Sequence, residues 1–289
     1  MAKQVILVTG ANGQLGKEFR VLAINETGFD FHFLSRDELP IHDFERVKSF
    51  FAEHRPAFCI NCAAYTVVDK AESEQDLAYL VNAESVAVLA EVCKQYGTGF
   101  IHVSTDYVFK GDSPEPYKED SQTGPVSVYG ASKLKGEIMS VANNPDSIII
   151  RTAWVYSEFG HNFVKTMIRL MKERNELNVV NDQVGAPTYA ADLAKAIMAI
   201  IKSNKWAPGI YHFSNKGKIS WYDFAVEIKE LTGSECKLNP IPTSQYPTPA
   251  KRPAFSLLDT SKIERVYGVN IPDWKLSLKK CLDHLKQAS

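Results

Sequence analysis

A phenol and an ammonium group are spaced for proton transfer in the segment Tyr129-Gly-Ala-Ser-Lys133. Residues four positions apart lie about one turn apart on the same face of a helix. A tyrosine, with an ordinary pKa of about 10, is a poor acid–base catalyst at neutral pH, and a nearby lysine cation lowers that pKa by stabilising the phenolate. Tyr129 and Lys133 are therefore candidate catalytic residues, with simple packing of Tyr129 as the alternative.

A threonine hydroxyl supplies a third candidate catalytic group. Thr105 directly follows the apolar run Phe100-Ile-His-Val-Ser104, which is typical of a strand. Its hydroxyl could bond a substrate carbonyl, or it could only cap the strand. A glycine-rich loop, this hydroxyl and the Tyr129–Lys133 pair occur along the chain in the order that a nicotinamide-dependent carbonyl reductase needs. We therefore favour a catalytic site built from these three residues.

The glycine-rich loop is the stretch VTGANGQLG at residues 8–16, between a strand-like run and a helical pattern. Its three glycines follow the spacing GxxGxxG, one residue wider than the dinucleotide pattern GxGxxG. Glycine permits a sharp exit from the strand and a close approach of a pyrophosphate, and the helix that follows offers free N–H groups to phosphates. The candidate cofactor residues of the loop are Gly10, Asn12, Gly13, Gln14, Leu15 and Gly16.

The residues after the second strand-like run bear on the choice of cofactor. Phe31-His-Phe-Leu-Ser35 is followed by Arg36 and Asp37. An acidic residue near this point binds the ribose 2′-hydroxyl of NAD, whereas an arginine accommodates the 2′-phosphate of NADP. Arg36 favours NADPH, and Asp37 keeps NADH open. Asp43 could bond the adenine amino group with Phe44 against the ring, or Asp43 could be the N-cap of the helix that follows.

Short apolar runs alternate with helical patterns through the first half of the chain. Strand-like runs span residues 5–9, 31–35, 58–64, 100–104 and 147–151, and helical patterns span residues 15–23, 45–54 and 82–96. Strands that are apolar nearly throughout are typical of a sheet covered on both faces. The alternation favours an α/β fold with a doubly wound parallel sheet of the Rossmann type. In such a sheet the ligand lies beyond the carboxyl ends of the strands, where every motif above falls.

The alternation weakens after about residue 155, and prolines cluster in residues 239–249. We therefore expect a dinucleotide-binding domain at residues 1–155, with about 178–215 returning to it. A smaller C-terminal substrate lobe would consist of residues 156–177 and 216–289.

Composition and charge narrow the class of protein. The chain of 289 residues has a formal net charge of −1, which gives no reason to expect nucleic acid or an anionic membrane as a partner. No apolar run reaches the roughly 20 residues that span a bilayer, and the N-terminus leads into a strand-like run without the pattern of a signal peptide. We expect a cytoplasmic protein. Cys59 and Cys62 have the spacing of a metal or redox pair, but alternation along a strand would point them to opposite faces, so buried, reduced thiols are expected.

Several segments together resemble the extended short-chain dehydrogenase/reductase family. They are TGANGQLG at 9–16, NCAAYT at 61–66, STDYVF at 104–109 and the Tyr129–Lys133 pair. RTAWVY at 151–156, DQVGAPT at 182–188 and KRPAFSLLD at 251–259 are similar to the family's reductases of 4-keto sugar nucleotides. The resemblance covers nearly the whole chain.

The resemblance implies NAD(P)H-dependent reduction of the 4-keto group of dTDP-6-deoxy-L-lyxo-4-hexulose to dTDP-L-rhamnose. Tyr129 would deliver the proton, Lys133 would hold the nicotinamide ribose and tune Tyr129, and Thr105 would polarise the carbonyl. The residues implied to border the cofactor are Ala63, Ala64 and Tyr65. The residues implied to bind the substrate are Asp106, Tyr107, Trp154, Gln183 and Arg252.

Some of these roles have alternatives. Trp154 could fill the core, and Arg252 could form a surface salt bridge. In some members of the family that this chain resembles, glutamates hold a magnesium ion between subunits. Only Glu18 matches that set here, and an acidic residue is missing near Ala191, so we predict no metal.

Two other functions remain open from the sequence. One is another nucleotide-sugar reductase or epimerase. A dehydratase is disfavoured because Tyr107 stands where dehydratases of the family tend to have a glutamate. The other is a regulatory NADP-binding subunit resembling the β subunit of methionine adenosyltransferase. The expected partner is a dTDP-sugar, and a homodimer is the oligomeric state that we consider.

Overall fold

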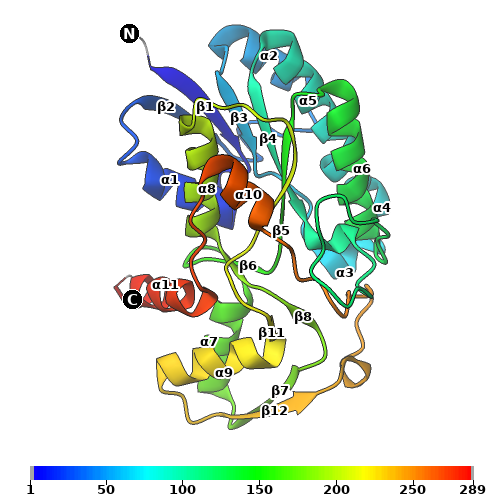
Figure 1. The fold of residues 1–289 in the computed structure, drawn as a ribbon, viewed down its shortest axis with the longest axis vertical. Helices are drawn as coiled ribbons and strands as arrows, with labels where there is room; N and C mark the ends of the chain where they lie inside the picture. Colours follow the sequence, from blue (N-terminus) through cyan, green and yellow to red (C-terminus); the bar gives the residue numbers. More distant parts are fainter. Residues whose placement is uncertain (1–2, 288–289) are drawn as a thin grey trace.

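The computed structural model describes residues 3–287, so the outermost residues of the two expected domains, 1–2 and 288–289, lie outside it. Within the described residues, the largest sheet has six strands in the order β10-β5-β4-β3-β1-β2 (Figure 1). All of its pairings are parallel. The strands are β1 (Gln4–Thr9), β2 (Phe29–Leu34), β3 (Phe58–Asn61), β4 (Gly99–Thr105), β5 (Ile148–Thr152) and β10 (Gly209–Phe213).

Helices cover both faces of this sheet. Alternate residues of β1 point to opposite faces: Ile6 and Val8 join a buried cluster with α1 (Gln14–Ala23) and α8 (Ala190–Lys202). Leu7 joins a second cluster with α2 (Phe44–His54) and α5 (Ser85–Tyr96). Burial on both faces explains why most residues of the strands are apolar. The predicted doubly wound parallel sheet is confirmed.

The chain order of the strands reverses between β1 and β3. From β1 the chain first moves outward to β2 and then crosses back to β3 on the other side of β1. The helices that follow the two strands therefore leave in opposite directions, and a crevice opens beyond their carboxyl ends. The glycine-rich loop and residues 62–66 both begin at this crevice.

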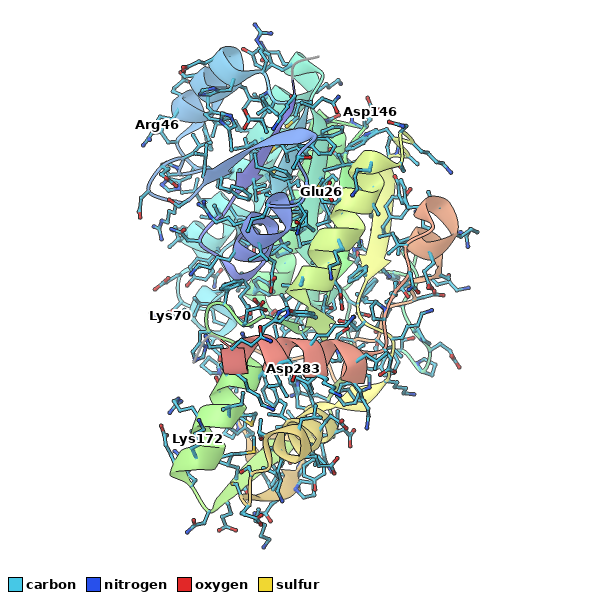
Figure 2. All side chains as sticks on the ribbon, turned by 90° about the vertical axis from the view of Figure 1, so that its left-hand side faces the viewer. Glu26, Arg46, Lys70, Asp146, Lys172 and Asp283 are labelled. Atoms are coloured by element: carbon cyan, nitrogen blue, oxygen red, sulfur yellow. The ribbon has the colours of Figure 1, made fainter. Side chains whose placement is uncertain are left out.

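A second core lies below the sheet in Figure 1. Here β7 (Glu176–Val180) pairs in parallel with β12 (Lys237–Ile241), and α7 (Phe163–Glu173) and α9 (Trp221–Thr232) pack on them. Helix α11 (Trp274–Gln287) contributes Trp274 and Leu278 to the same core and lies across the molecule between the two regions (Figure 2). We call this region the lobe. The domain boundaries drawn from the sequence stay a prediction.

Short elements complete the fold. Two small pairs are β6 (Val155–Tyr156) with β9 (Thr188–Tyr189) and β8 (Val184–Gly185) with β11 (Ile219–Ser220). The remaining helices are α3 (Val68–Ala71), α4 (Gln75–Tyr79), α6 (Val128–Asn143), α10 (Ser261–Tyr267), the π-helical η1 (Leu80–Glu84) and the 3₁₀ turns η2 (Asp106–Val108) and η3 (Thr243–Gln245). Among residues 3–287, no helix has the length and apolar character to cross a bilayer.

The strand expected at residues 58–64 is shorter than predicted. Strand β3 ends at Asn61, because the chain then turns along the crevice, so the alternation argument does not reach Cys62. Cys59 is buried, Cys62 is half-buried, and both are free thiols.

Candidate active site

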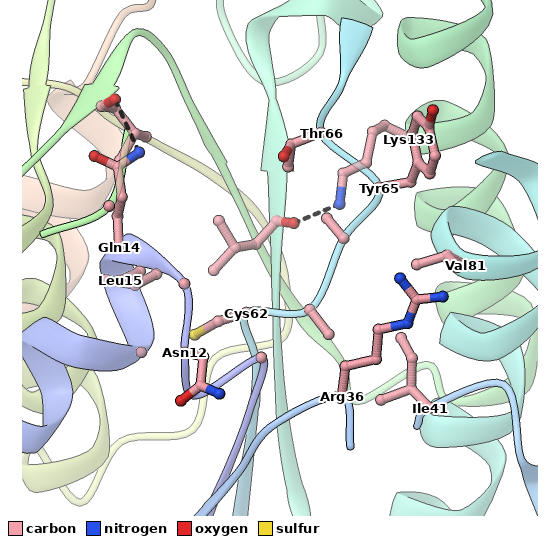
Figure 3. Close-up of a pocket in the computed structure, with 18 of the residues that line it drawn as sticks. Asn12, Gln14, Leu15, Arg36, Ile41, Cys62, Tyr65, Thr66, Val81 and Lys133 are labelled. Atoms are coloured by element: carbon pink, nitrogen blue, oxygen red, sulfur yellow. Dashed lines mark hydrogen bonds between the residues drawn. The ribbon is translucent and has the colours of Figure 1, made fainter. Parts of the chain in front are cut away.

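A cavity of about 500 Å³ lies beyond the carboxyl ends of the central strands (Figure 3). Figure 3 shows Gln14 and Leu15 on one side of it and Arg36 and Lys133 on the other. We call it the cofactor cavity. The predicted cofactor residues that line it are Gly10, Asn12, Gly13, Gln14, Leu15, Gly16, Arg36, Ala63, Ala64 and Tyr65.

The three glycines of the loop act in different ways. Gly10 has a φ of +64°, and a Cβ there would lie 2.7 Å from the Ala63 backbone nitrogen. A Cβ on Gly16 would lie 2.6 Å from Ala11 Cα. Gly13 is the N-cap of α1 and provides no side-chain cap. Gly10 and Gly16 therefore permit close backbone packing. Gly13 leaves the N–H groups at the start of α1 free for an anion in the cavity.

The residues after β2 fall on different sides of the cavity wall. Arg36 is exposed and lines the cavity, whereas Asp37 does not. Asp43 accepts a hydrogen bond from the Arg46 backbone N–H at 3.2 Å and caps α2, which begins at Phe44. Asp43 and Phe44 are not among the lining residues, so the structure shows the helix cap and brings neither residue to the cavity. The geometry favours a 2′-phosphate beside Arg36.

Apolar residues that sequence reasoning missed complete this end of the cavity. They are Leu39, Ile41, Leu77 and Val81. Gly160 and His161, just before α7, close the opposite side. These residues carry no chemical motif and are far apart in the chain, so only the fold identifies them.

Helix α6 brings Tyr129 and Lys133 to the same cavity, one turn apart. A Cβ on Gly130 would overlap the Tyr107 carbonyl oxygen, so this glycine permits α6 to lie against η2. The rings of Tyr107 and Tyr129 then meet edge to face with centroids 5.5 Å apart. On the next turns of the helix, Glu137 forms a buried ion pair with Arg151 of β5 at 2.7 Å. Packing and this ion pair therefore fix the position of the two candidate catalytic residues.

Burial decides the protonation of Tyr129. It raises the pKa of Tyr129 to about 12, although a hydrogen bond with the Thr105 hydroxyl lowers that pKa; the Asp106 charge raises it further. Lys133 Nζ donates to the Val103 carbonyl oxygen at 2.7 Å (Figure 3). The tuning of Tyr129 by Lys133 stays a prediction. The phenol is protonated at neutral pH, which is the form that a proton donor needs.

Thr105 and Asp106 lie behind the tyrosine pair and do not line the cavity. The Thr105 hydroxyl donates to Asp106 Oδ1 at 3.0 Å and accepts from the Tyr107 N–H. Asp106 is 1% exposed, and burial raises its pKa to about 6 despite hydrogen bonds from Ser256 and Thr105. Thr105 thus reaches Tyr129 directly, and the Asp106 carboxyl beside it titrates close to pH 6.

A second cavity of about 760 Å³ lies between the sheet region and the lobe. We call it the lobe cavity. Tyr107, Gln183 and Arg252, all predicted to bind the substrate, line it. Trp154 does not line it but stacks on Trp221, which does, with ring centroids 3.7 Å apart. Most of the wall is apolar and comes from lobe residues, including Phe163, Met167, Leu170, Leu177, Val179 and Ile241.

Arg252 forms an ion pair across the lobe cavity's edge. Its Nη1 and Nη2 lie 3.0 and 2.8 Å from the two carboxylate oxygens of Asp69 on α3. The bond with Arg252 holds the pKa of Asp69 below its ordinary value. Gln183 is buried and donates to Thr243 at 3.1 Å. The salt bridge that was the alternative role for Arg252 is present. It links the segment that follows the prolines of residues 239–249 to α3 beside the lobe cavity.

The side chains around Glu18 hydrogen-bond to neighbouring groups. The Ser157 hydroxyl donates to Glu18 at 2.6 Å, and Glu158 hydrogen-bonds to Tyr189 and His284. Within residues 3–287, no group of three or more His, Cys, Asp or Glu side chains is placed to hold a metal ion.

Comparison with known proteins identifies the family of this chain. A family described as RmlD substrate binding domain matches residues 4–287. The chain belongs to this family. The match confirms the resemblance drawn from the sequence.

Three similar proteins carry the name dTDP-4-dehydrorhamnose reductase. A dTDP-4-dehydrorhamnose reductase of Sinorhizobium fredii is 42% identical over 95% of this chain and 95% of its own. The crystal structure of a dTDP-4-dehydrorhamnose reductase from Clostridium acetobutylicum is 44% identical, with a TM-score of 0.94 over 98% of this chain and 100% of that chain. A Bacillus anthracis dTDP-4-dehydrorhamnose reductase in complex with NADP is 39% identical, with a TM-score of 0.93 over 98% and 100% of the two chains.

Proposed function

We propose that this protein uses NADPH to reduce the 4-keto group of dTDP-6-deoxy-L-lyxo-4-hexulose, giving dTDP-L-rhamnose. The names of the relatives support the reaction, and the NADP complex of one of them supports the cofactor. The observation that carries the proposal is that Tyr129 lines the cavity of the glycine-rich loop while its contact partner Tyr107 lines the lobe cavity. A nucleotide and a sugar bound in the two cavities meet at this tyrosine pair.

The residues of the cofactor cavity fit a dinucleotide with a 2′-phosphate. The start of α1 would hold the pyrophosphate, and Arg36 would hold the 2′-phosphate. Lys133 would hold the nicotinamide ribose. When bound, the cofactor supplies a hydride to C4 of the sugar.

The protein's own part in the chemistry is to supply a proton. The C4 carbonyl becomes an alcohol when the carbon gains a hydride and the oxygen gains a proton. Tyr129 would deliver that proton, since burial keeps the phenol protonated at neutral pH. Thr105 bonds to Tyr129 and would share the polarisation of the carbonyl oxygen.

The lobe cavity fits the other half of the substrate. Its apolar wall, with Trp221 stacked on Trp154, suits a nucleobase ring. A guanidinium can donate two hydrogen bonds to the oxygens of one phosphate. The ion pair with Asp69 holds the Arg252 guanidinium at the cavity edge. Gln183 and Tyr107 would then lie beside the base and the sugar, with the buried Asp106 behind Tyr107.

A panel assay tests the proposal. Purified protein is given several 4-keto sugar nucleotides with NADPH or with NADH, and the C4 configuration of each product is determined. Oxidation of NADPH by the dTDP-4-keto sugar is expected, whereas a tightly bound NADPH that no such substrate oxidises would favour a regulatory NADP-binding subunit. A homodimer and a cytoplasmic location stay predictions.

A further inference from the structure

A buried row of polar side chains crosses the sheet and ends at Lys133. Thr9, Asn61 and His102 are register partners on the neighbouring strands β1, β3 and β4. All three are 0% exposed, and Lys133 is 2% exposed. Buried polar groups of this kind need matched donors and acceptors, so the direction of each hydrogen bond in the row can be worked out.

The backbone fixes the orientation of the Asn61 amide. The Ala63 N–H lies 3.2 Å from Asn61 Oδ1, and a backbone N–H can only donate. The Thr9 hydroxyl, at 2.7 Å from the same oxygen, donates as well. The amide NH₂ of Asn61 therefore faces His102 Nδ1, at 3.0 Å. Turning the amide over would set its NH₂ against the Ala63 N–H.

The Asn61 amide in turn selects the tautomer of His102. Since the amide donates to Nδ1, that nitrogen carries no proton. Burial holds the pKa of His102 well below its ordinary value, so the ring is neutral. A neutral imidazole without a proton on Nδ1 carries it on Nε2, which lies 3.3 Å from Lys133 Nζ.

The last contact matches only one form of Lys133. As an ammonium, Lys133 would point three N–H donors at Val103 O, the cofactor cavity and the His102 Nε2–H, and the last pair would be donor against donor. As a neutral amine it donates to Val103 O at 2.7 Å, keeps one N–H for the cavity and accepts from His102. We propose that His102 is a positioning residue whose Nε2–H donates to Lys133 Nζ and favours the neutral amine in the unliganded protein.

The shift in the Lys133 pKa has the direction that this assignment requires. Burial lowers the pKa of Lys133 to about 8, and Glu137 on the same helix and Cys62 after β3 act in the opposite direction. The ammonium therefore predominates at neutral pH, and the neutral amine that can accept from His102 predominates above about pH 8. Lys133 gains its third N–H when the bond to His102 is broken.

The tautomer is tested on the full chain without ligand. Long-range ¹H–¹⁵N correlation of ¹⁵N-labelled histidine reports which ring nitrogen is protonated, and the His102 signals are assigned by their loss in His102→Gln. The neutral Nε2-protonated form is expected at neutral pH. A ring protonated on Nδ1, or an imidazolium, would overturn the proposal.

Asn61→Asp tests whether the row controls Lys133. A carboxylate at this position accepts from the imidazole, so the proton moves to Nδ1 and the bare Nε2 accepts from a Lys133 ammonium. The midpoint for titration of Lys133, followed in ¹³C-labelled lysine, should rise by about one unit or more. A rise without the change of tautomer would mean that the added charge acts through space alone, and the proposal would fail.

Thr9→Val is the matched control at the far end of the row. It removes one hydrogen bond to Asn61 Oδ1 but keeps the Ala63 N–H, so both the tautomer and the Lys133 midpoint should stay unchanged. A reversed tautomer in Thr9→Val would contradict the role given to Ala63. If Asn61→Asp does not fold, the wild-type tautomer and this control decide the matter.

Any role of the row in turnover rests on the proposed reductase function, whereas the direction of the hydrogen bonds does not. With the keto sugar nucleotide as substrate, the pH profile of kcat should move in Asn61→Asp in step with the Lys133 midpoint. A profile that stays in place would remove His102 from turnover. Absence of turnover in the wild type would defeat the reductase and leave the spectroscopic result intact.

Discussion

The two cavities that meet at Tyr107 and Tyr129 are assembled from the chain in different ways. The cofactor cavity is built mainly from residues within a few positions of the carboxyl ends of β1, β2, β3 and β4. The lobe cavity combines Tyr107 with α7, β7, α9 and residues 241–252. The first is encoded by short segments of one sheet, and the second forms only when distant segments dock. Substitutions should therefore separate cofactor binding, substrate binding and chemistry.

The largest effect is expected where the cavities meet. Tyr129→Phe removes the proton donor but keeps the ring that contacts Tyr107. Turnover should fall by at least about a hundredfold while NADPH affinity stays within a few-fold. Steady-state kinetics and NADPH titration measure the two effects. Near-normal turnover would remove Tyr129 from the mechanism.

A smaller effect, on substrate binding alone, is expected from substitutions in the lobe cavity. Arg252→Ala removes a guanidinium from the cavity edge and leaves Asp69 unpaired. The KM for the sugar nucleotide should rise by about tenfold or more, with NADPH affinity unchanged. The exposed neighbour Lys251, changed to Ala, is the control and should have little effect on either. Equal losses for both ligands would show that the cavities are not separate.

Arg36→Ala should weaken NADPH binding by about tenfold and NADH binding much less, because only NADPH carries the 2′-phosphate. Titration with each nucleotide measures the difference. Asp37 is next to Arg36 but does not line the cavity, so Asp37→Ala should leave the affinities for NADPH and NADH unchanged. Equal losses of NADPH and NADH in Arg36→Ala would show that this arginine does not read the phosphate.

The smallest effect on activity is expected where α1 contacts the segment leading to the lobe, and there the change is in stability. Burial, followed by the hydrogen bond with Glu158, raises the pKa of Glu18 from 4.5 to about 8. The folded protein thus holds this proton more tightly than the unfolded chain, so the stability that it contributes is complete below about pH 4.5 and is lost as the pH rises toward 8.

Glu18→Gln, which stays neutral, should gain stability relative to the wild type as the pH rises over that range, by about 1 kcal/mol for each pH unit. Thermal unfolding at a series of pH values measures it. The exposed Glu91, changed to Gln, should show no such trend. A difference between Glu18→Gln and the wild type that does not vary with pH would contradict the raised pKa.

The same contrast explains what the sequence could predict. The glycine spacing, Arg36 and the Tyr129–Lys133 pair are local patterns, and all of these residues line the cofactor cavity. The sequence could not show that Lys133 contacts Val103 and His102, because those contacts depend on how α6 packs on β4. Nor could it show that Trp154 supports Trp221 from behind, since the two residues lie far apart in the chain.

Transfer of label from the cofactor to the sugar tests the central claim most directly. NADPH carrying deuterium at the transferable position of the nicotinamide is supplied with dTDP-6-deoxy-L-lyxo-4-hexulose, and the product is analysed by NMR and mass spectrometry. One deuterium at C4 of dTDP-L-rhamnose is the predicted result. A product without deuterium at C4, or no product while NADPH stays bound, would contradict a reaction at the junction of the two cavities.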